Sequence, residues 1–451
     1  MKKQIYSRIT LMIILVTLTF FIKSCDTSSD NEDLSKSEQG KASREASTVV
    51  VDWYDLQLQM IIKANPAISP ILLNRAFGYI GIGLYESVRP GISKSVSLSE
   101  KLFEMPTMPD KENNNGYAWG VSANAALARL ITNFYPEAVV TLNKQRIDSL
   151  EAAYNDSSSP SVQSEVFQRS QEFGRAIADA IIAWSKTDNS NLSNAAYVPP
   201  VFSGSWQPTP PAFANGLSPY FGNTRPFLEQ NQQLLAPAFI YAYSEDPASD
   251  FYKMEKGMYD LSLALTVEQK NIASYWNDFG VGIGYTPPGH SISILTQILK
   301  NQETDLGKAA TAYAKTGIAL NDAAITCWKS KYTYNLLRPV TYIKKVIDPN
   351  WMPFLGTPAH PEYPAAHAYI TGAFMQAMTG LFGENFSFTD HTYQSKFGGP
   401  RTYPSFNAAA DECGQSRRYG GIHNPPSIET GLTLGRQIGL DINHIELVKT
   451  Q

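Results

Sequence analysis

Three short patterns near the C-terminal end of the sequence combine positively charged residues with histidines. They are Lys331, six residues and Arg338-Pro339; Pro364-Ala365-Ala366-His367; and Ser416-Arg417, five residues and His423. Arginine offers oxyanion oxygens a planar, permanently charged fork, and lysine offers them a point charge. Three cations suit the equatorial oxygens of a five-coordinate centre, with one imidazole to bond the central atom and another to exchange a proton. These residue types therefore indicate a pocket for a tetrahedral or trigonal-bipyramidal oxyanion.

The first pattern is expected on a helix over residues 306–337. Lys331 and Arg338 are almost two helical turns apart, so both side chains would lie on one helical face. Tyr313 and Cys327 share roughly that face, which predicts that the two cations point toward the interior. Pro339 would end the helix just after Arg338. Taken alone, this pattern would more often be a solvated helix edge with two incidental basic residues.

The second pattern is expected at the beginning of a helix whose first residue is Pro364. The unpaired amides of Ala365 and Ala366 could then donate hydrogen bonds to an anion at the helix N-terminus, with His367 one turn further along. An isolated histidine at such a position would more often have a core or surface role. The nearby His360 could suggest a metal site, but no HExxH or paired-Cys spacing supports zinc. His360 is instead expected to line the mouth of the pocket.

The third pattern spans a predicted sharp turn between two helices. Arg417 and His423 do not share one face of a straight helix, but Gly420-Gly421 between them permits the chain to turn. Pro425-Pro426 would start the next helix just after His423. Each of the three patterns is a weak signal alone, and their joint occurrence in this order is a strong one.

Helical periodicity dominates the chain from residue 48 onward. Segments 72–88, 121–134 and 139–154 show it, as does the longer segment that contains Phe173, Ile177, Ile181 and Trp184. Proline- and glycine-rich stretches at 197–211 and 216–226 interrupt the helices, and period-2 strand patterns are scarce. The sequence therefore predicts an all-α, multi-helix bundle with long irregular loops. A division near residue 230 would separate an N-terminal helical half, 48–230, from a catalytic helical half, 231–451.

The composition is that of an ordinary globular protein. The chain has 451 residues, 43% of them hydrophobic and 17% charged, which suffices for a large core in one or two domains. Its net charge of -4 does not indicate nucleic-acid binding, so any basic site must be local. The oligomeric state is not indicated by these features.

The N-terminal segment has the features of a targeting sequence. A basic region precedes a mostly apolar stretch at 9–22, which is too short for a membrane-spanning helix. The small residue Ser24 before Cys25 resembles a bacterial lipoprotein cleavage site. Residues 1–24 would then be a signal peptide, Cys25 the lipidated residue and 25–47 a polar, flexible tether. This predicts a lipid-anchored protein of the bacterial cell envelope, periplasmic or on the cell surface. An ordinary anchor or a cleaved signal with an incidental Cys is the alternative.

Cys327 and Cys413 are the cysteines that remain after this segment. An oxidising compartment would permit one disulfide between them. Two buried free thiols fit the sequence equally well, because a free cysteine often behaves as a small core residue.

The three patterns resemble the signature of the type 2 phosphatidic acid phosphatase and vanadium-dependent haloperoxidase superfamily, which reads K-x6-R-P, P-S-G-H and S-R-x5-H. The first and third elements match in full, and the second matches at Pro364 and His367. Further similarity covers about residues 50–445 and favours the bacterial haloperoxidase branch. It includes Asn74-Arg75-Ala76, Leu84-Tyr85-Glu86-Ser87, Tyr275-Trp276-Asn277-Asp278 and Pro287-Pro288-Gly289-His290. Of these, His290 is expected to be structural, with pocket lining as the alternative.

The resemblance implies a role for each residue of the three patterns. His423 would be the axial ligand of the vanadium in vanadate, or the phosphorylated nucleophile of a phosphatase, and His367 would be the general acid/base. Lys331, Arg338 and Arg417 would bind the equatorial oxygens, and the Ala366 amide would replace that of the family glycine. Candidates for a carboxylate that orients the axial histidine are Asp278 and its rival Glu412.

The second element departs from the family pattern, because Ala365 stands at the position of the serine hydroxyl and Ala366 at that of the glycine. Losing one hydrogen bond to a charged group costs about 1.5–3 kcal/mol. Three functions therefore remain open: a haloperoxidase that uses vanadate, peroxide and a halide; a cofactor-free acid phosphatase acting on phosphate esters; and a catalytically impaired surface lipoprotein that binds an oxyanion.

Overall fold

The computed structural model describes residues 41–113, 115–279 and 282–448. The α-helices among them are α2 (Thr48–Lys63), α3 (Pro70–Val88), α4 (Trp119–Phe134), α5 (Glu137–Ser158), α6 (Ser164–Ser185), α7 (Asp250–Leu263), α8 (Val267–Tyr275), α9 (Thr286–Asn301), α10 (Leu306–Tyr334), α11 (Pro339–Val346), α12 (Ala366–Phe382), α13 (Phe406–Tyr419) and α14 (Pro425–Asn443). One antiparallel pair, β1 (Phe388–Asp390) and β2 (Arg401–Tyr403), is the sheet of the described residues. The prediction of an all-α bundle is confirmed.

The described residues also form six short 3-10 helices, one before α2 and five in the connections between the α-helices. They are η1 (Ala42–Arg44), η2 (Arg89–Gly91), η3 (Leu98–Glu100), η4 (Ser190–Leu192), η5 (Phe221–Asn223) and η6 (Glu229–Gln233). The long connection between α6 and α7 contains three of them and is otherwise irregular, as its proline and glycine content predicts.

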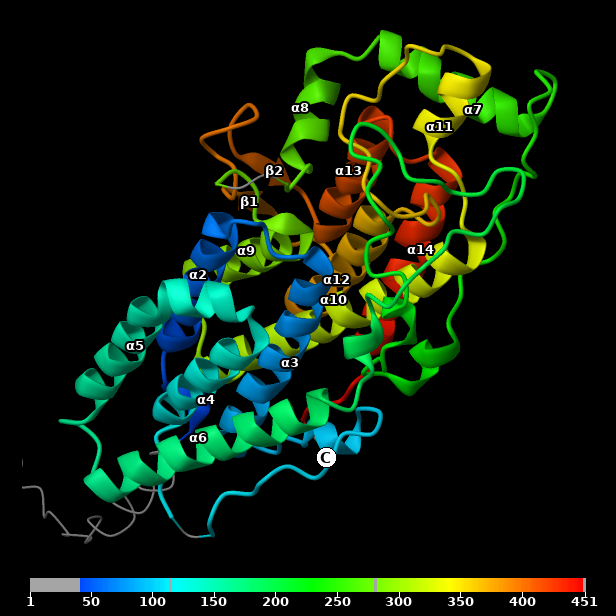
Figure 1. Cartoon of the computed structure of the whole chain (residues 1–451). Helices are drawn as coiled ribbons and strands as arrows, with labels where there is room; N and C mark the ends of the chain where they lie inside the picture. Colours follow the sequence, from blue (N-terminus) through cyan, green and yellow to red (C-terminus); the bar gives the residue numbers. More distant parts are fainter. Residues whose placement is uncertain (1–40, 114, 280–281, 449–451) are drawn as a thin grey trace, which may run out of the picture. The chain divides into compact units, whose positions relative to one another are not determined.

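Four long helices make up the centre of the bundle (Figure 1). Helix α3 packs along α10, and α12 packs along α14 and also against α10. In Figure 1, α4, α5 and α6 lie at one end of this centre, and α7, α8 and α11 lie at the other. Because α3 belongs to the N-terminal half and α10 to the C-terminal half, the two expected halves share one hydrophobic core.

Glycines allow the central helices to approach closely. A Cβ added at Gly435 of α14 would lie 2.1 Å from the Tyr369 carbonyl oxygen of α12. A Cβ added at Gly317 of α10 would lie 2.4 Å from the Phe77 carbonyl oxygen of α3. Backbone atoms are in contact at both places, so any larger residue must push two helices apart.

The folded chain begins earlier than the sequence predicts. Residues 42–47, expected within the flexible tether, pack on the helices: Ala42 is fully buried, and the Glu45 carboxylate accepts hydrogen bonds from the amides of Trp119 and Gly120. The polar composition of this stretch does not indicate that it caps a helix. Glu45 does so by accepting hydrogen bonds from the backbone amides at the start of α4. The expected signal peptide, 1–24, the lipidation site Cys25 and the tether up to residue 40 lie outside the described residues.

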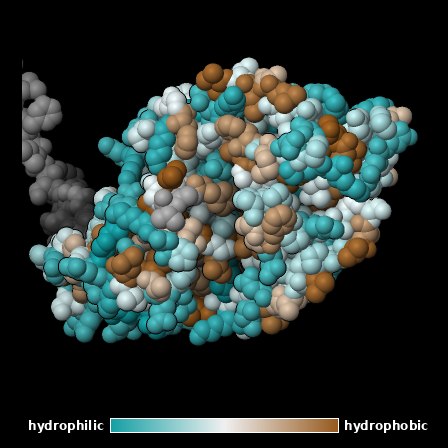
Figure 2. All heavy atoms as spheres, turned by 45° about the horizontal axis from the view of Figure 1, so that its top comes forward, coloured by the Kyte–Doolittle hydropathy of each residue, from teal (hydrophilic) through white to brown (hydrophobic). Residues whose placement is uncertain are grey.

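The surface of the described residues is mixed in character. Figure 2 shows a face on which small hydrophobic patches are scattered among hydrophilic side chains. Within the described ranges, no helix has both the length and the apolar character needed to cross a membrane. Cys327 and Cys413 are both buried as free thiols, which settles the choice between a disulfide and free cysteines in favour of the latter.

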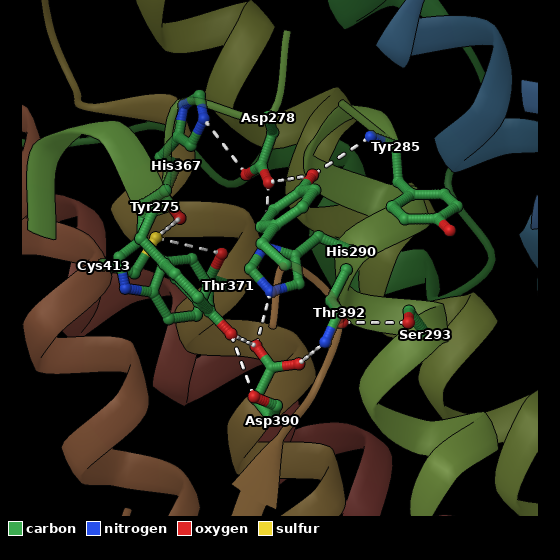
Figure 3. A network of polar contacts seen from close by, with 12 residues as sticks. Tyr275, Asp278, Tyr285, His290, Ser293, His367, Thr371, Asp390, Thr392 and Cys413 are labelled. Atoms are coloured by element: carbon green, nitrogen blue, oxygen red, sulfur yellow. Dashed lines mark hydrogen bonds and ion pairs between the residues drawn. The ribbon is translucent and has the colours of Figure 1, made fainter. Parts of the chain in front are cut away.

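A buried ionic chain joins α9 to the loop before it and to strand β1 (Figure 3). His290 of α9 bonds through Nδ1 to Asp278 Oδ1 at 2.8 Å and through Nε2 to Asp390 Oδ2 at 2.7 Å. Burial alone would lower the pKa of His290, but the Asp278 and Asp390 carboxylates outweigh it and raise the pKa to about 10. Tyr393 and Tyr275 donate hydroxyl hydrogen bonds to the two carboxylates. The expected structural role of His290 therefore takes the form of an imidazolium held between two carboxylates.

We expect Gly435→Ala to lower the free energy of unfolding by about 1–3 kcal/mol, because its methyl group would overlap the backbone of α12. The matched control is Gly257→Ala in α7, where no atom lies within 4 Å of the added Cβ. That control should instead be stabilising by about 0.5–1 kcal/mol, since alanine has the higher helix propensity. Urea unfolding of the three proteins measures both effects, and equal changes in the two variants would contradict the close helix contact.

We expect His290→Gln to cost about 3–5 kcal/mol near pH 6, because two buried carboxylates lose their cation. The folded-state pKa of His290 lies above its ordinary value, so its stabilisation is complete below about pH 6.5. It decreases through the window between there and pH 10, and is lost above the folded-state pKa of about 10. The wild type should therefore approach the variant in stability as the pH rises to 10.

The measurement is the free energy of unfolding at pH 6, 8 and 10, with the exposed His391→Gln as the control. A difference between wild type and His290→Gln that stays constant over this range would contradict the assignment of the charge to His290.

Candidate oxyanion-binding site

The structure brings the charged residues and histidines of all three sequence patterns together. Lys331 lies in the last turn of α10, Arg338 directly before α11 and His367 in the first turn of α12. Arg417 lies in the last turn of α13, and His423 precedes α14 by two residues. All five side chains are buried, and the three cations are fully so. Helix termini supply every one of them, so the packing of α10, α12, α13 and α14 determines the geometry.

The expected shared helix of Lys331 and Arg338 is wrong. Helix α10 ends at Tyr334, where Asn335 adopts a left-handed conformation with φ 46°. Arg338 is extended and caps α11, of which Pro339 is the first residue. The physical reason is that proline disfavours a helical residue before it but is well suited to the first position of a helix. A turn, not a helical face, thus brings the guanidinium back toward Lys331.

The second pattern also differs from its expectation. Helix α12 begins at Ala366, two residues after Pro364. The Ala365 amide donates to the Ser427 carbonyl oxygen at 3.1 Å, so it is not available to an anion. Among the described residues, the amides of Ala366 and His367 have no hydrogen-bond acceptor, as expected at the first turn of a helix. The Ala366 amide therefore remains a candidate donor.

Backbone carbonyl oxygens surround the three buried cations. None of Lys331, Arg338 and Arg417 forms an ion pair with a carboxylate of the described residues. The accepting carbonyl groups are those of Pro361 and Glu362 for Lys331, His360 and Ile422 for Arg338, and Trp276 for Arg417. Burial, together with Arg338, lowers the pKa of Lys331 to about 7. An anion in contact with these groups would supply the missing negative charge, because buried cations are costly without a counter-ion.

His423 is held by a residue that was not predicted, Glu362. The ring Nδ1 lies 3.1 Å from Glu362 Oε1, which also accepts the Asn424 amide at 2.9 Å. We assign the proton to Nδ1 from this contact, which leaves a lone pair on Nε2, 3.1 Å from Arg338 Nη1. Burial, with Arg338 and Lys331 adding to it, keeps the pKa of His423 well below its usual range. His423 therefore presents a neutral imidazole nitrogen to the cation cluster.

Neither carboxylate that the sequence suggested for this role contacts His423. Glu412 instead accepts hydrogen bonds from Trp276 Nε1 at 3.0 Å and from Arg401 at 2.7 Å. Asp278 belongs to the ionic chain of His290. Glu362 could have been suspected, since it stands two residues before Pro364, but its side chain gave no motif signal.

His367 faces a different carboxylate. Its Nε2 lies 3.3 Å from Arg417 Nη1. The same atom lies 3.8 Å from Asp278 Oδ2 (Figure 3). Burial and the neighbouring Arg417 keep the pKa of His367 well below its usual range, so the ring is neutral. Asp278 thus connects His367 to His290, and the ionic chain fixes the carboxylate beside this histidine.

His360 lies deeper than the pocket mouth where it was expected. Its Nδ1 is 3.0 Å from Arg338 Nη2, and its ring packs on Trp328 with the ring centroids 5.0 Å apart. A cavity of about 380 Å³ adjoins the site, and His360, Ala366 and His367 line it. The cavity therefore lies next to the cation cluster.

These residues fit an oxyanion. Three cations and the Ala366 amide can surround its oxygens, and the Nε2 lone pair of His423 can bond its central atom. The described residues contain no group of three or more His, Cys, Asp or Glu side chains that could hold a bare metal ion. His423 Nε2 could serve as a nitrogen ligand to the vanadium of vanadate, so vanadate fits the residues present. The side chain of Ala365 offers no hydroxyl to such an anion.

Comparisons with known proteins agree with this arrangement. A family model described as the VCPO second helical-bundle domain matches residues 311–446, which include all three patterns. The crystal structure of a bacterial vanadium-dependent iodoperoxidase is 31% identical, with a TM-score of 0.81, and the match covers 90% of this chain and 98% of that one. No curated protein matches the sequence.

Two structures of a bacterial vanadium-dependent chloroperoxidase share the fold. The holo-type is 18% identical with a TM-score of 0.62, and the match covers 84% of this chain and 92% of that one. The apo-type is 17% identical with a TM-score of 0.61, covering 85% and 94%. The iodoperoxidase match carries the family assignment, because it combines sequence identity with nearly complete coverage of both chains. The chain belongs to the vanadium-dependent haloperoxidase family.

Proposed function

We propose that this protein is a vanadate-dependent haloperoxidase that uses hydrogen peroxide to oxidise a halide to a hypohalous acid. The observation that carries the proposal is the cluster of Lys331, Arg338 and Arg417, which are fully buried and have no carboxylate in ion-pair contact among the described residues. Two neutral histidines present their Nε2 atoms to this cluster, 3.1 and 3.3 Å from arginine nitrogens. The likeness to the iodoperoxidase supports the same reaction class.

The three cations have the task of neutralising the vanadate oxygens. Arginines that now donate to His423 and His367 would turn their N–H groups to these oxygens, and Lys331 would keep its position on two carbonyl oxygens. Bound vanadate would supply the electrophilic centre at which peroxide is activated. The lower pKa of Lys331 means that a bound anion must also hold this lysine in its charged form.

The two histidines have separate tasks. Glu362 keeps the proton of His423 on Nδ1, so that Nε2 stays available as the ligand atom. His367 is neutral and lies beside Asp278, which suits a base that takes a proton from peroxide and returns it later. The environments of the two rings therefore support ligation by His423 and proton transfer by His367.

The predicted lipid anchor bears on where the reaction takes place. If Cys25 carries a lipid, the folded part of the chain is tethered outside the cytoplasm, where peroxide and halide are supplied from the surroundings. We propose this lipid-anchored location, and mass spectrometry of the protein purified from bacterial membranes tests directly whether Cys25 carries a lipid.

The central test is a halide-oxidation assay on protein loaded with vanadate. With peroxide and iodide or bromide, the wild type should halogenate a phenolic dye, and His423→Ala should lose both turnover and vanadate binding. Glu362→Gln should bind vanadate about 10–100-fold more weakly, because the ligand ring loses the carboxyl group that accepts its Nδ1 hydrogen bond.

Two outcomes would contradict the proposal. One is a wild type that neither binds vanadate nor oxidises any halide. The other is hydrolysis of an aryl phosphate that disappears in His423→Ala while halide oxidation is absent, which would identify the phosphatase instead. Glu412→Gln is the matched control, since this carboxylate contacts Arg401 and Trp276 but not His423.

The alanine pair of the second pattern yields a separate prediction. Restoring the family serine with Ala365→Ser should tighten vanadate binding by about one to two orders of magnitude, because one hydrogen bond to a charged group is worth about 1.5–3 kcal/mol. Ala368→Ser is the control, since Ala368 is equally buried one turn further along α12. Equal affinities for wild type and Ala365→Ser would show that this position does not face the anion. Halide oxidation found only after Ala365→Ser and Ala366→Gly together would show that the native chain is a catalytically impaired member of its family.

A further inference from the structure

A second cavity lies against a face of α10 that does not belong to the oxyanion site. Its volume is about 320 Å³, within the range of about 300–1,000 Å³ that is usual for small-molecule pockets. Ile325 and Lys329 of α10 line it, whereas Trp328 lines the cavity beside the oxyanion site. Among the described residues the two cavities share no lining residue. A ligand of the second cavity would therefore touch none of the residues that line the first.

A buried arginine from the connection between α6 and α7 belongs to the lining. The side chain of Arg225 is 6% exposed, and its Nη1 donates to Thr187 Oγ1 at 2.7 Å. Its Nη2 donates to the Trp184 carbonyl oxygen at 3.2 Å, and its guanidinium carbon lies 5.1 Å from the centroid of the Trp184 ring. The guanidinium group is therefore held in one orientation, which favours the recognition of a carboxylate.

Two cations and one carboxylate give the described lining a net positive charge. The carboxylate is that of Glu104, whose Oε2 lies 3.2 Å from Arg225 Nη1 and whose side chain is 60% exposed, so water weakens this ion pair. Lys329 has no carboxylate in ion-pair contact among the described residues, and its Nζ donates to the Gln232 carbonyl oxygen at 2.6 Å. An ammonium group carries three donors, so Lys329 retains two for a ligand. One negative charge on a ligand would balance the lining.

Amide side chains supply the remaining polar groups of the lining. Those of Asn189, Asn223, Gln232 and Gln233 are exposed and form no hydrogen bond with another described residue. An amide group carries donors and an acceptor, and a hydroxyl group likewise carries both. Hydroxyl groups of a ligand can therefore replace water at these amides without a loss of hydrogen bonds, which an apolar ligand could not do.

The backbone at the cavity is held in an uncommon conformation at two lining residues. The φ angle is 54° at Glu104 and 66° at Asn189, both in the left-handed region. Asparagine tolerates this region, whereas glutamate adopts it rarely. Residues held in this way occur preferentially where a protein binds a ligand, because the surrounding structure must maintain the strain. The strained backbone of Glu104 is thus a second indication of a binding site, independent of the charges.

We propose that this cavity binds a small hydroxylated carboxylate of the size of a single sugar acid, with its carboxylate on Arg225 and Lys329 and its hydroxyl groups on the amide side chains. A neutral sugar would leave the positive charge of the lining unbalanced. A phosphate group, with a charge of about -1.5 to -2 at pH 7, would exceed it. The site is separate from the oxyanion site, and the proposal does not depend on the haloperoxidase reaction.

Binding is tested by isothermal titration calorimetry of the full chain, free of vanadate and peroxide, at pH 7 and low salt. The probes are glucuronate, glucose, which lacks the carboxylate, and acetate, which lacks the hydroxyl groups. Glucuronate should bind at least about tenfold more tightly than either of the others, because only glucuronate uses both the cations and the amides. Absence of glucuronate binding, or an affinity for glucose or acetate equal to that for glucuronate, would overturn the proposal.

Variants then show whether glucuronate binds in this cavity or at the cations of the oxyanion site. Lys329→Gln should weaken glucuronate at least about tenfold and leave glucose unchanged. Lys308→Gln is the matched control, because this lysine lies on the same helix with an 80% exposed side chain outside the cavity lining. The control should bind glucuronate as the wild type does. Glucuronate binding that is unchanged in Lys329→Gln would place the ligand elsewhere and overturn the proposal.

A substitution with the opposite sign excludes a merely structural effect. Glu104→Gln should tighten glucuronate binding about 2–5-fold, because it removes the carboxylate that competes for Arg225. A general disturbance of the cavity would weaken binding in both Glu104→Gln and Lys329→Gln, and that result would contradict the assigned contacts. Both side chains are partly or largely exposed, so neither substitution removes a core contact. The comparison of glucuronate with glucose and acetate needs no variant at all.

Discussion

The site depends on three buried cations that have no carboxylate in ion-pair contact among the described residues. Lys331, Arg338 and Arg417 are removed from water but are held by carbonyl oxygens of the backbone instead of carboxylates. Partial charges of this kind orient a cation without neutralising it. The cluster therefore keeps its positive potential for an anion from outside. Most of the accepting carbonyl groups lie in the loops between helices, where the backbone has no helical partner.

The central helix packing sets the distances within this cluster. His367 begins α12 and His423 comes just before α14, so the contact between these two helices fixes one histidine relative to the other. The close approach at Gly435 is part of that contact. A second level of support lies behind each ring, with Glu362 at His423 and the Asp278–His290–Asp390 chain beside His367 (Figure 3). Stability and chemistry thus share the same buried groups.

The residue patterns did not identify the carboxylate that holds His423. Asp278 was a candidate because its segment resembles the family and Glu412 was its rival, and neither contacts His423. Glu362, which does, is 61 residues away from it and was passed over. Hydrogen bonds between side chains so distant in the chain depend on how two loops meet in space. Periodicity and capping signals reflect the local sequence, so they do not predict such long-range contacts.

The sequence by itself determined the helical fold class, most helix positions and the identity of the five charged and histidine residues in the cluster. Local rules suffice for these, since apolar spacing predicts helices and proline or glycine marks their ends. Tertiary structure alone decided that Arg338 reaches Lys331 through a turn, that the Ala365 amide is occupied, and that an apolar cavity adjoins the site. These features depend on contacts between segments far apart in the chain, and only the packed core brings such segments together.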